Sequence, residues 1–410
     1  MRRSVVQRGL EAGEVLTGLF QPAGADFESA GVLSWDAEQG AELRLADLSH
    51  AWPTDFDAEL AVHGRLHAGV QVTLLQSRLR DLTAFNQAAK FVSDALALGA
   101  YTDSDETWEY ASYCPTSLHE WYPERGFVHR SDDEHGSQRV ELRQVEPKRL
   151  KVPDAAIDLQ LDGDWTVNYD AKWSIETTME FVVRPDEALT IEDYWRRFRS
   201  PLLGFTRFAS NRPDDLKWEA FGTSETKRRI VVLRSPRESY ERKWRLTPGR
   251  FLFRAEDIAD ESEVIQRWLE VWRASEPSLG LFCETIQEDS AYSPARFLTL
   301  YTAAEGYWKG TMRPGESKWK IDKLAQRADI SPAVSHANKK ALKLIGGLRD
   351  YHAHLTLRDN LTADEVALST YDSTRRLHVL MQACLLRELG LESEQIESLI
   401  GRHYINWPVP

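Results

Sequence analysis

The chain has 410 residues and a formal net charge of −13 at pH 7. This length predicts two or more domains, and a composition of 42% hydrophobic and 28% charged residues excludes a disordered chain. An acidic chain repels nucleic acid in general, so any RNA binding needs a local basic surface. Three widely spaced cysteines exclude a disulfide framework and a thiolate zinc site.

The sequence also bears on location. No run of about 18 apolar residues occurs, so we expect no membrane span. The first twenty residues contain no continuous apolar segment, so we expect no secretory signal. These patterns predict a cytoplasmic protein.

The first part of the chain is dominated by short alternating segments, which are typical of a half-solvated antiparallel sheet. One segment, 190–210, instead has helical spacing, with Thr190 as a candidate cap. We therefore predict a β-rich domain over residues 1–256, built as one unit or as two subdomains. Its expected strands are 31–35, 41–48, 60–67, 70–77, 139–145, 155–161, 165–170, 174–185, 228–235 and 250–256.

The pattern becomes helical after residue 256. Ser293 and Pro294 are typical of a helix start, and Thr362 with Glu365 forms a capping box. We predict an all-α bundle over residues 257–410, which makes the chain an α+β multidomain protein. Its expected helices are 261–275, 293–310, 335–355, 362–390 and 392–400.

The segment "GGLRDYHAHL", residues 346–355, concentrates chemically active side chains on the third of these helices. At about 100° per residue, a wheel with Arg349 at zero places Asp350 at about 100° and His354 at about 140°. His352 falls at about 300°, inside the apolar arc, where we expect a packed or hydrogen-bonded histidine. The expected apolar arc consists of Ala341, Leu344, Ile345, Leu348, Tyr351 and Leu355.

Arg349, Asp350 and His354 therefore share the arc that faces away from the core. Histidine can move protons near neutral pH, and arginine can hold a phosphate with two hydrogen bonds. Phosphodiester cleavage needs both roles. The alternative is an ordinary exposed polar face, in which Asp350 and His354 form an i,i+4 pair.

The segment "RDYHAH" resembles the HEPN ribonuclease signature, in which an arginine is followed by a polar residue, often Asn, Asp or His, and then by a histidine after four to six intervening residues. Arg349, Asp350 and His354 occupy those places, with four residues between the arginine and the histidine. A strand-rich N-terminal region, then "FLTLYTAAEGYW" and this motif, resembles the ApeA-like anti-phage proteins, which carry a C-terminal HEPN domain.

The resemblance implies a metal-independent endoribonuclease without cofactors that acts in anti-phage defence by abortive infection. It implies a homodimer or higher homo-oligomer, a phage-derived trigger, and transfer, messenger or ribosomal RNA as substrate. The substrate 2′-hydroxyl would attack the adjacent phosphate, with His354 as general acid or base. Arg349 would stabilise the phosphoryl oxygens, and Asp350 would orient either partner.

Further residues are candidates for supporting roles. Glu305 lies at the edge of the preceding helix's apolar stripe, where it either holds Arg349 in place or stays solvated at the rim. Residues 309–349 contain ten Lys or Arg against three acidic residues and could follow an RNA backbone. The alternative is a solvated face with ion pairs. The best RNA-binding candidates in this stretch are Lys339, Lys340 and Lys343.

Two other functions remain open. The helical bundle could be a non-catalytic RNA-binding or dimerisation module, with ligand sensing in the β-rich domain. A hydrolase site in the β-rich domain is the third hypothesis, although the sequence contains no phosphate loop, nucleophile elbow or zinc-binding motif. We expect no metal site.

Overall fold

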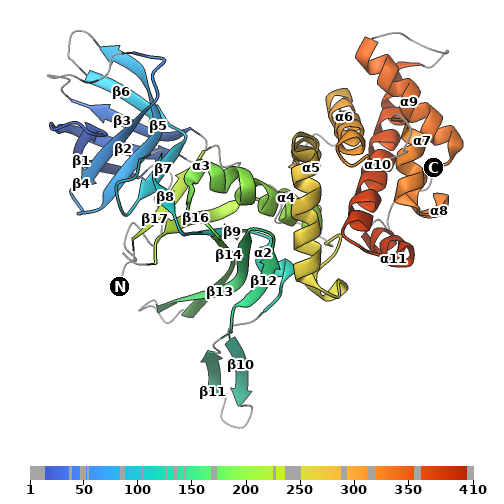
Figure 1. Ribbon diagram of the computed structural model, residues 1–410, viewed down its shortest axis with the longest axis horizontal. Helices are drawn as coiled ribbons and strands as arrows, with labels where there is room; N and C mark the ends of the chain where they lie inside the picture. The colour runs from blue at the N-terminus through green and yellow to red at the C-terminus, as the bar shows by residue number, and fades with distance from the viewer. Residues whose placement is uncertain are drawn as a thin grey trace.

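The computed structural model confirms the predicted order of a β-rich region followed by an all-helical region (Figure 1). The two regions correspond to residues 15–234 and 255–403. The residues that the structure describes are 14–36, 39–46, 52, 55–83, 88–103, 105–124, 127–132, 137–142, 145–167, 173–224, 228–235, 251–287, 293–312, 319–354 and 362–403.

The N-terminal strands form a closed sheet. Neighbouring strands pair in the order β5-β4-β1-β2-β3-β6, and β6 also pairs with β5, which closes the ring. Alternate side chains point inward and fill it, among them Phe20, Trp35 and Phe91, each at most 1% exposed. The strands are β1 (Val15–Pro22), β2 (Ser29–Asp36), β3 (Gly40–Leu45), β4 (Leu60–Leu66), β5 (Gln71–Thr83) and β6 (Ala88–Ser93).

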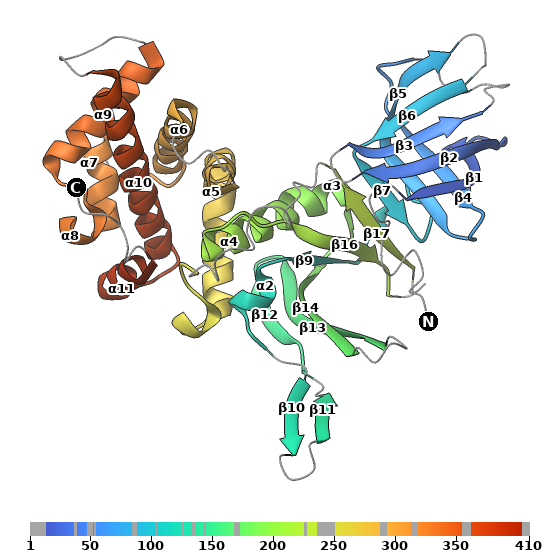
Figure 2. The same cartoon turned by 180° about the vertical axis from the view of Figure 1, so that it is seen from behind.

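The same sheet continues outward from β5 as an open, antiparallel layer. Its order is β7-β17-β16-β9-β14-β13-β12. Their bounds are β7 (Ala95–Leu98), β9 (Tyr110–Pro115), β12 (Lys148–Val152), β13 (Ala155–Val167), β14 (Trp173–Pro185), β16 (Leu216–Gly222) and β17 (Arg229–Arg234). A separate hairpin, β10 (Phe127–Asp132) and β11 (Ser137–Leu142), projects from this layer in both views (Figures 1 and 2).

Smaller elements complete the β-rich region. The pair β8 (Thr107–Trp108) and β15 (Leu189–Thr190) lies beside the main sheet, and α2 (Leu118–Trp121) follows β9. The predicted helix over 190–210 is a continuous run of three segments. The Thr190 hydroxyl caps it by accepting the Asp193 N–H at 3.2 Å. The segments are α3 (Ile191–Tyr194), the π-helical η1 (Trp195–Arg199) and α4 (Ser200–Ser210).

The helical region begins with α5 (Glu261–Gln287), which is longer than predicted and is kinked at Ser275. Pro277 follows that residue and removes a backbone donor, which accounts for the kink. The predicted caps at Ser293 and Thr362 are both present. The other helices are α6 (Pro294–Gly310), α7 (Ile321–Ala328), α8 (Pro332–Ser335), α9 (Lys339–His354), α10 (Ala363–Glu388) and α11 (Ser393–His403).

One of the predicted strands is wrong, and another is joined to its neighbour. Residues 251–254 are not a strand, because Phe251, Leu252 and Phe253 are all buried and the N–H groups of Leu252 and Phe253 bond to the carbonyl of Ala209 on α4. The chain then makes a short 3-10 turn, η3 (Ala255–Asp257). The segment predicted as a separate strand from Trp165 onward continues β13 as far as Val167, and 168–170 lie outside the described residues.

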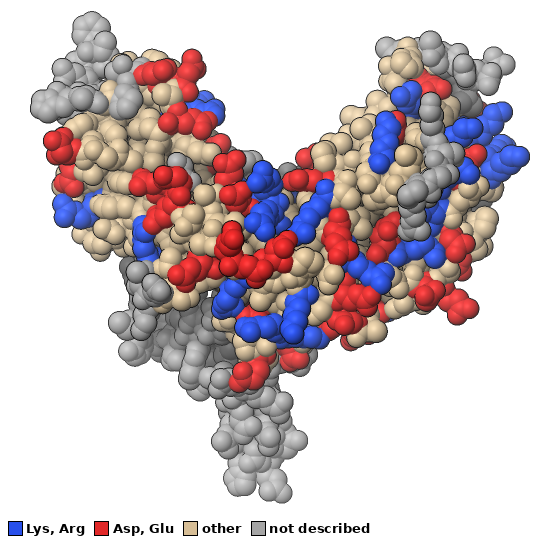
Figure 3. Space-filling view, viewed as in Figure 1, with Lys and Arg blue, Asp and Glu red and all other residues tan. Residues whose placement is uncertain are grey.

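One hydrophobic core extends from the open sheet through α4 and α5 into the helices. The Trp268 indole of α5 stacks on Phe208 of α4 at 5.2 Å and donates to the Pro201 carbonyl at 2.7 Å. The division at residue 256 therefore does not coincide with a gap in the core, and it stays a prediction. The face of the molecule that Figure 3 shows is hollowed between the β-rich and helical lobes, and acidic and basic side chains are interspersed on it.

Within the described residues, no helix combines the length and the apolar character that crossing a membrane requires.

Candidate functional site

The candidate site lies on α9, on the side of the helical region that faces away from the closed sheet (Figures 1 and 2). Ala341, Ile345 and Leu348 are buried as the wheel predicts, and Leu342 is buried as well. Leu344 and Tyr351 are only partly buried, and Leu355 lies outside the described residues. The buried arc packs against α6, α7 and α10, and among the described residues Lys343, Gly347 and His354 on the opposite arc are exposed.

Arg349 and Asp350 interact with each other on the uncovered arc. The Arg349 Nη1 donates to Asp350 Oδ1 at 3.1 Å, and the two side chains are 38% and 47% exposed. The Arg349 guanidinium also lies 6.0 Å from the ring centroid of Tyr301 on α6. The Arg349 guanidinium is not enclosed by the protein, so it remains available to a phosphate. Asp350 was predicted to orient either Arg349 or His354, and in the structure it accepts a hydrogen bond from Arg349.

His354 is exposed at the C-terminal end of α9. Among the described residues its side chain has no hydrogen bond or ion pair, so the ring is open to contact with a ligand. Five positions separate it from Arg349, which places the two side chains about 140° apart around the helix and about 7.5 Å apart along its axis. One copy of α9 therefore does not direct both groups at a single point.

His352 occupies the packed position that the wheel predicts. Its Nε2 lies 2.8 Å from the Thr370 Oγ1 on α10, and its ring meets Phe297 edge-on at 5.8 Å. The Thr370 hydroxyl donates to the Val366 carbonyl at 2.7 Å, so we assign the proton of the first bond to His352 Nε2. Burial lowers the pKa of His352, which keeps the ring neutral at pH 7.

Tyr301 on α6 and Trp319 belong to the surroundings of the site. Trp319 Nε1 donates to the Tyr301 hydroxyl at 3.3 Å. Burial raises the pKa of Tyr301, while the nearby Arg349 guanidinium opposes that rise. The aromatic stripe of α6 gave no signal of this role, because only the packing of α9 against α6 brings the phenol and the guanidinium together.

Glu305 does not bind Arg349. Its carboxylate pairs with Lys309 one turn along α6 at 2.8 Å, and 29% of its side chain is exposed. This position agrees with the alternative of a glutamate at the helix rim. Because Glu305 lies within electrostatic range of the Tyr301 hydroxyl, it acts on the site only indirectly.

Lys339, Lys340 and Lys343 are all exposed on the first two turns of α9. Among the described residues none of them has an ion pair, so their charges are not neutralised locally. Their exposure agrees with the alternative of a solvated face as well. Their binding to RNA stays a prediction.

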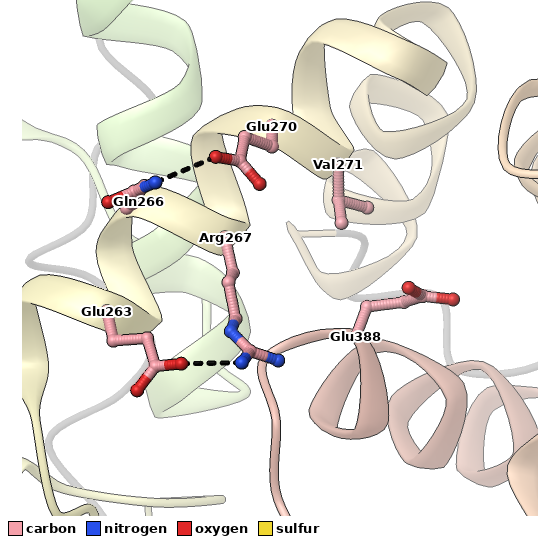
Figure 4. Close-up of a pocket in the computed structure, with 6 residues that line it drawn as sticks. All are labelled: Glu263, Gln266, Arg267, Glu270, Val271 and Glu388. Carbon is pink, nitrogen blue, oxygen red and sulfur yellow. Dashed lines mark hydrogen bonds and ion pairs between the residues drawn. The ribbon is translucent and has the colours of Figure 1, made fainter. Parts of the chain in front are cut away.

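A separate pocket of about 480 Å³ lies between α5 and the C-terminal end of α10 (Figure 4). Its lining contains three carboxylates, those of Glu263, Glu270 and Glu388, against the single guanidinium of Arg267. Arg267 donates to Glu263, so its charge is already paired. This pocket would repel a phosphate and is not a candidate for RNA binding.

In the part of the chain that the structure describes, no group of three or more His, Cys, Asp or Glu side chains is arranged to hold a metal ion. A comparison with family models matched "ApeA N-terminal domain 1" over residues 16–268, more than half of the chain. The match ends inside α5 and does not include α9. No significant match was found among curated proteins or among solved structures. The matched region and the β-rich fold together show that the chain belongs to the ApeA family.

Proposed function

We propose that this ApeA-family protein is a metal-independent HEPN endoribonuclease that acts in anti-phage defence by abortive infection. The family membership supports the defence role. The observation that carries the nuclease role is the placement of Arg349 and His354 on the uncovered arc of α9, one beside a carboxylate and the other unbonded. The β-rich region would sense a phage-derived trigger.

The proposed reaction is an internal transesterification of RNA. A base, His354, removes the proton from a 2′-hydroxyl, and the 2′-oxygen forms a bond to the adjacent phosphorus. The bond from phosphorus to the 5′-oxygen breaks, and that oxygen takes up a proton. The products are a 2′,3′-cyclic phosphate and a 5′-hydroxyl. Arg349, held by Asp350, stabilises the charge that develops on the phosphoryl oxygens.

The proposed enzyme is a homodimer. Since Arg349 and His354 diverge by about 140° on one helix, a second α9 that faces the first would bring the arginine of one subunit near the histidine of the other. Lys339, Lys340 and Lys343, exposed on the same helix, would bind the RNA backbone beside this composite site.

The test compares His354→Ala with His352→Ala in the full-length protein. We expect His354→Ala to reduce RNA cleavage in EDTA by about 10²- to 10⁴-fold, because the proton-transfer group is lost. His352→Ala should keep the chemistry, because that ring is bonded to Thr370 and packed against Phe297. Cleavage is measured on total RNA, with analysis of the fragment ends and of protection from phage, and dimerisation is checked by light scattering.

The opposite result, cleavage by His354→Ala but not by His352→Ala, contradicts the assignment. The second hypothesis, a non-catalytic RNA-binding or dimerisation module, predicts that wild-type protein binds RNA without cutting it, even in extract from phage-infected cells. The metal-independent mechanism would be refuted if the wild-type protein cut RNA without EDTA but did not cut it in the presence of EDTA.

A further inference from the structure

A cavity of about 400 Å³ lies where the β-rich region meets α5. Its walls come from η1 and α4, from the end of β17, and from the second half of α5. The volume lies within the range of roughly 300–1,000 Å³ that is typical of small-molecule sites. We call it the arginine cavity, after the three guanidinium-bearing residues that line it: Arg199, Arg207 and Arg234.

Two of these arginines have no carboxylate partner. Arg199 Nε donates to the buried Glu219 carboxylate at 3.1 Å, which neutralises its charge. Arg207 Nε donates only to a backbone carbonyl, that of Asp214, at 2.9 Å. Arg234 lies flat on the Trp195 ring, at 3.7 Å from its centroid. Within the described residues, neither Arg207 nor Arg234 forms an ion pair.

The acidic residues that line the cavity form no ion pair with Arg207 or Arg234 among the described residues, although the charges of Asp215 and Asp214 act on Arg207 at longer range. The Asp214 carboxylate accepts hydrogen bonds from the Thr116 and Ser117 hydroxyls and from the Ser117 N–H. Asp215 Oδ1 accepts the Leu216 N–H at 2.8 Å. Glu284 is exposed on α5, where water screens its charge.

Burial acts on the two unpaired guanidinium groups. It lowers the pKa of Arg207 and of Arg234, and at Arg234 the nearby Arg199 adds to the effect. Arginine nevertheless stays protonated in proteins. A buried cation without a counter-charge is unfavourable, so a bound anion would relieve this penalty at both residues.

The cavity also has open space along α5. The Trp272 side chain lines it and is 5% exposed, and the indole N–H is enclosed by the protein. Gly280, on the same helix, would carry a Cβ with nothing within 4 Å. The cavity therefore has room for a ligand with several acceptor oxygens.

We propose that the arginine cavity binds a small phosphorylated molecule, of mononucleotide size or smaller, with its phosphate held by Arg207 and Arg234. Phosphate fits this set because guanidinium groups bind its oxygens through paired hydrogen bonds. The ligand would contact α4, β17 and α5 together, so it would tie the sheet region to the first long helix. This proposal does not depend on the nuclease assignment.

The test is thermal unfolding of the full-length protein with inorganic pyrophosphate or AMP, against sodium chloride at the same ionic strength and against adenosine. We expect the Tm to rise with the concentration of pyrophosphate and AMP, because a ligand of the folded state stabilises it. Adenosine and sodium chloride should leave it unchanged. The double variant Arg207→Gln, Arg234→Gln should bind AMP at least about tenfold more weakly.

Arg196→Gln is the matched control, because Arg196 lies on η1 next to the cavity wall but is 68% exposed. It should bind AMP as the wild type does. A second pair avoids loss of the buried arginines: Gly280→Leu should fill the open space and abolish the rise in Tm, while Gly280→Ala should retain it. The proposal would be overturned if the double variant or Gly280→Leu bound AMP as strongly as the wild type. It would also be overturned if adenosine or sodium chloride raised the Tm as much as AMP does.

Discussion

At the residue scale, two histidines two positions apart on α9 differ in every property that decides their chemistry. His352 is bonded to Thr370, packed against Phe297 and has a pKa lowered by burial. His354 is exposed and has no partner among the described residues. The difference follows from helical geometry, because a shift of two residues turns a side chain by about 200°. Under the proposed function, His354 is therefore the reactive histidine and His352 is a structural one.

Replacement of Thr370 tests the structural role of His352. Thr370→Val removes the acceptor of the His352 Nε2–H, so we expect the free energy of unfolding to fall by about 1–3 kcal/mol. The measurement is urea unfolding at pH 7. Thr374→Val is the control, since that buried hydroxyl bonds only to the Thr370 carbonyl of its own helix, and it should change stability little. Equal effects of both changes would contradict the assigned bond.

At the element scale, close packing of α4 against α5 joins the sheet region to the helices. Gly204 of α4 permits this approach, since a Cβ there would lie 2.3 Å from the Trp272 ring. Cys283 of α5 adds a weak hydrogen bond to the Gly204 carbonyl at 3.7 Å. The same crossing forms one wall of the arginine cavity, so its spacing determines the shape of that site.

Gly204→Ala should therefore destabilise the protein although alanine favours helices. We expect the free energy of unfolding to fall by about 1–3 kcal/mol, because Trp272 is buried and cannot move away freely. Gly347→Ala on α9 provides the contrast: its Cβ meets nothing within 4 Å, so alanine should stabilise by about 0.5–1 kcal/mol. Chemical denaturation of both variants measures the difference, and stabilisation by Gly204→Ala would show that the crossing is looser than described.

At the scale of the whole molecule, a buried polar network connects distant parts of the chain. Asn211, which ends α4 with a left-handed φ of 48°, accepts from His378 Nε2 at 3.1 Å and from Gln382 Nε2 at 2.9 Å. Its Nδ2 lies 2.7 Å from His403 Nε2 on α11. One amide thus links the helix of the β-rich region to two C-terminal helices.

This network predicts a pH dependence of stability. Burial lowers the pKa of His378 to about 3, with further lowering from Arg296 and His403. The unfolded chain takes up a proton near pH 6.5 and the folded chain does not, so stability is complete above about pH 6.5 and is lost as the pH falls toward 3. The expected slope from this group approaches about 1.4 kcal/mol per pH unit.

Urea unfolding of wild type and His378→Gln between pH 7 and pH 5 measures that slope. The variant should show a flatter dependence, while the exposed His67→Gln should follow the wild type. Identical pH profiles for wild type and His378→Gln would mean that His378 is protonated in the folded protein.

Much of the secondary structure could be predicted because its signals are local. Thr190, Ser293 and Thr362 each cap the helix that they were expected to begin. The strand predicted over 250–256 is wrong, because three consecutive buried residues resemble a strand in the sequence. In the structure, the N–H groups of Leu252 and Phe253 bond to the Ala209 carbonyl near the end of α4. The short helix α7 was missed, although it supplies part of the packing around α9.

For the candidate site, the spacing of apolar residues was enough to predict the buried arc of α9, because that spacing depends only on the helical period. Tertiary structure alone decided that Arg349 pairs with Asp350 beside Tyr301, and that Glu305 pairs with Lys309. It alone also placed Arg207, Arg234 and Trp272 around one cavity. The physical reason is that these contacts join residues from different elements or choose among equally near partners, and side-chain periodicity carries no information about either.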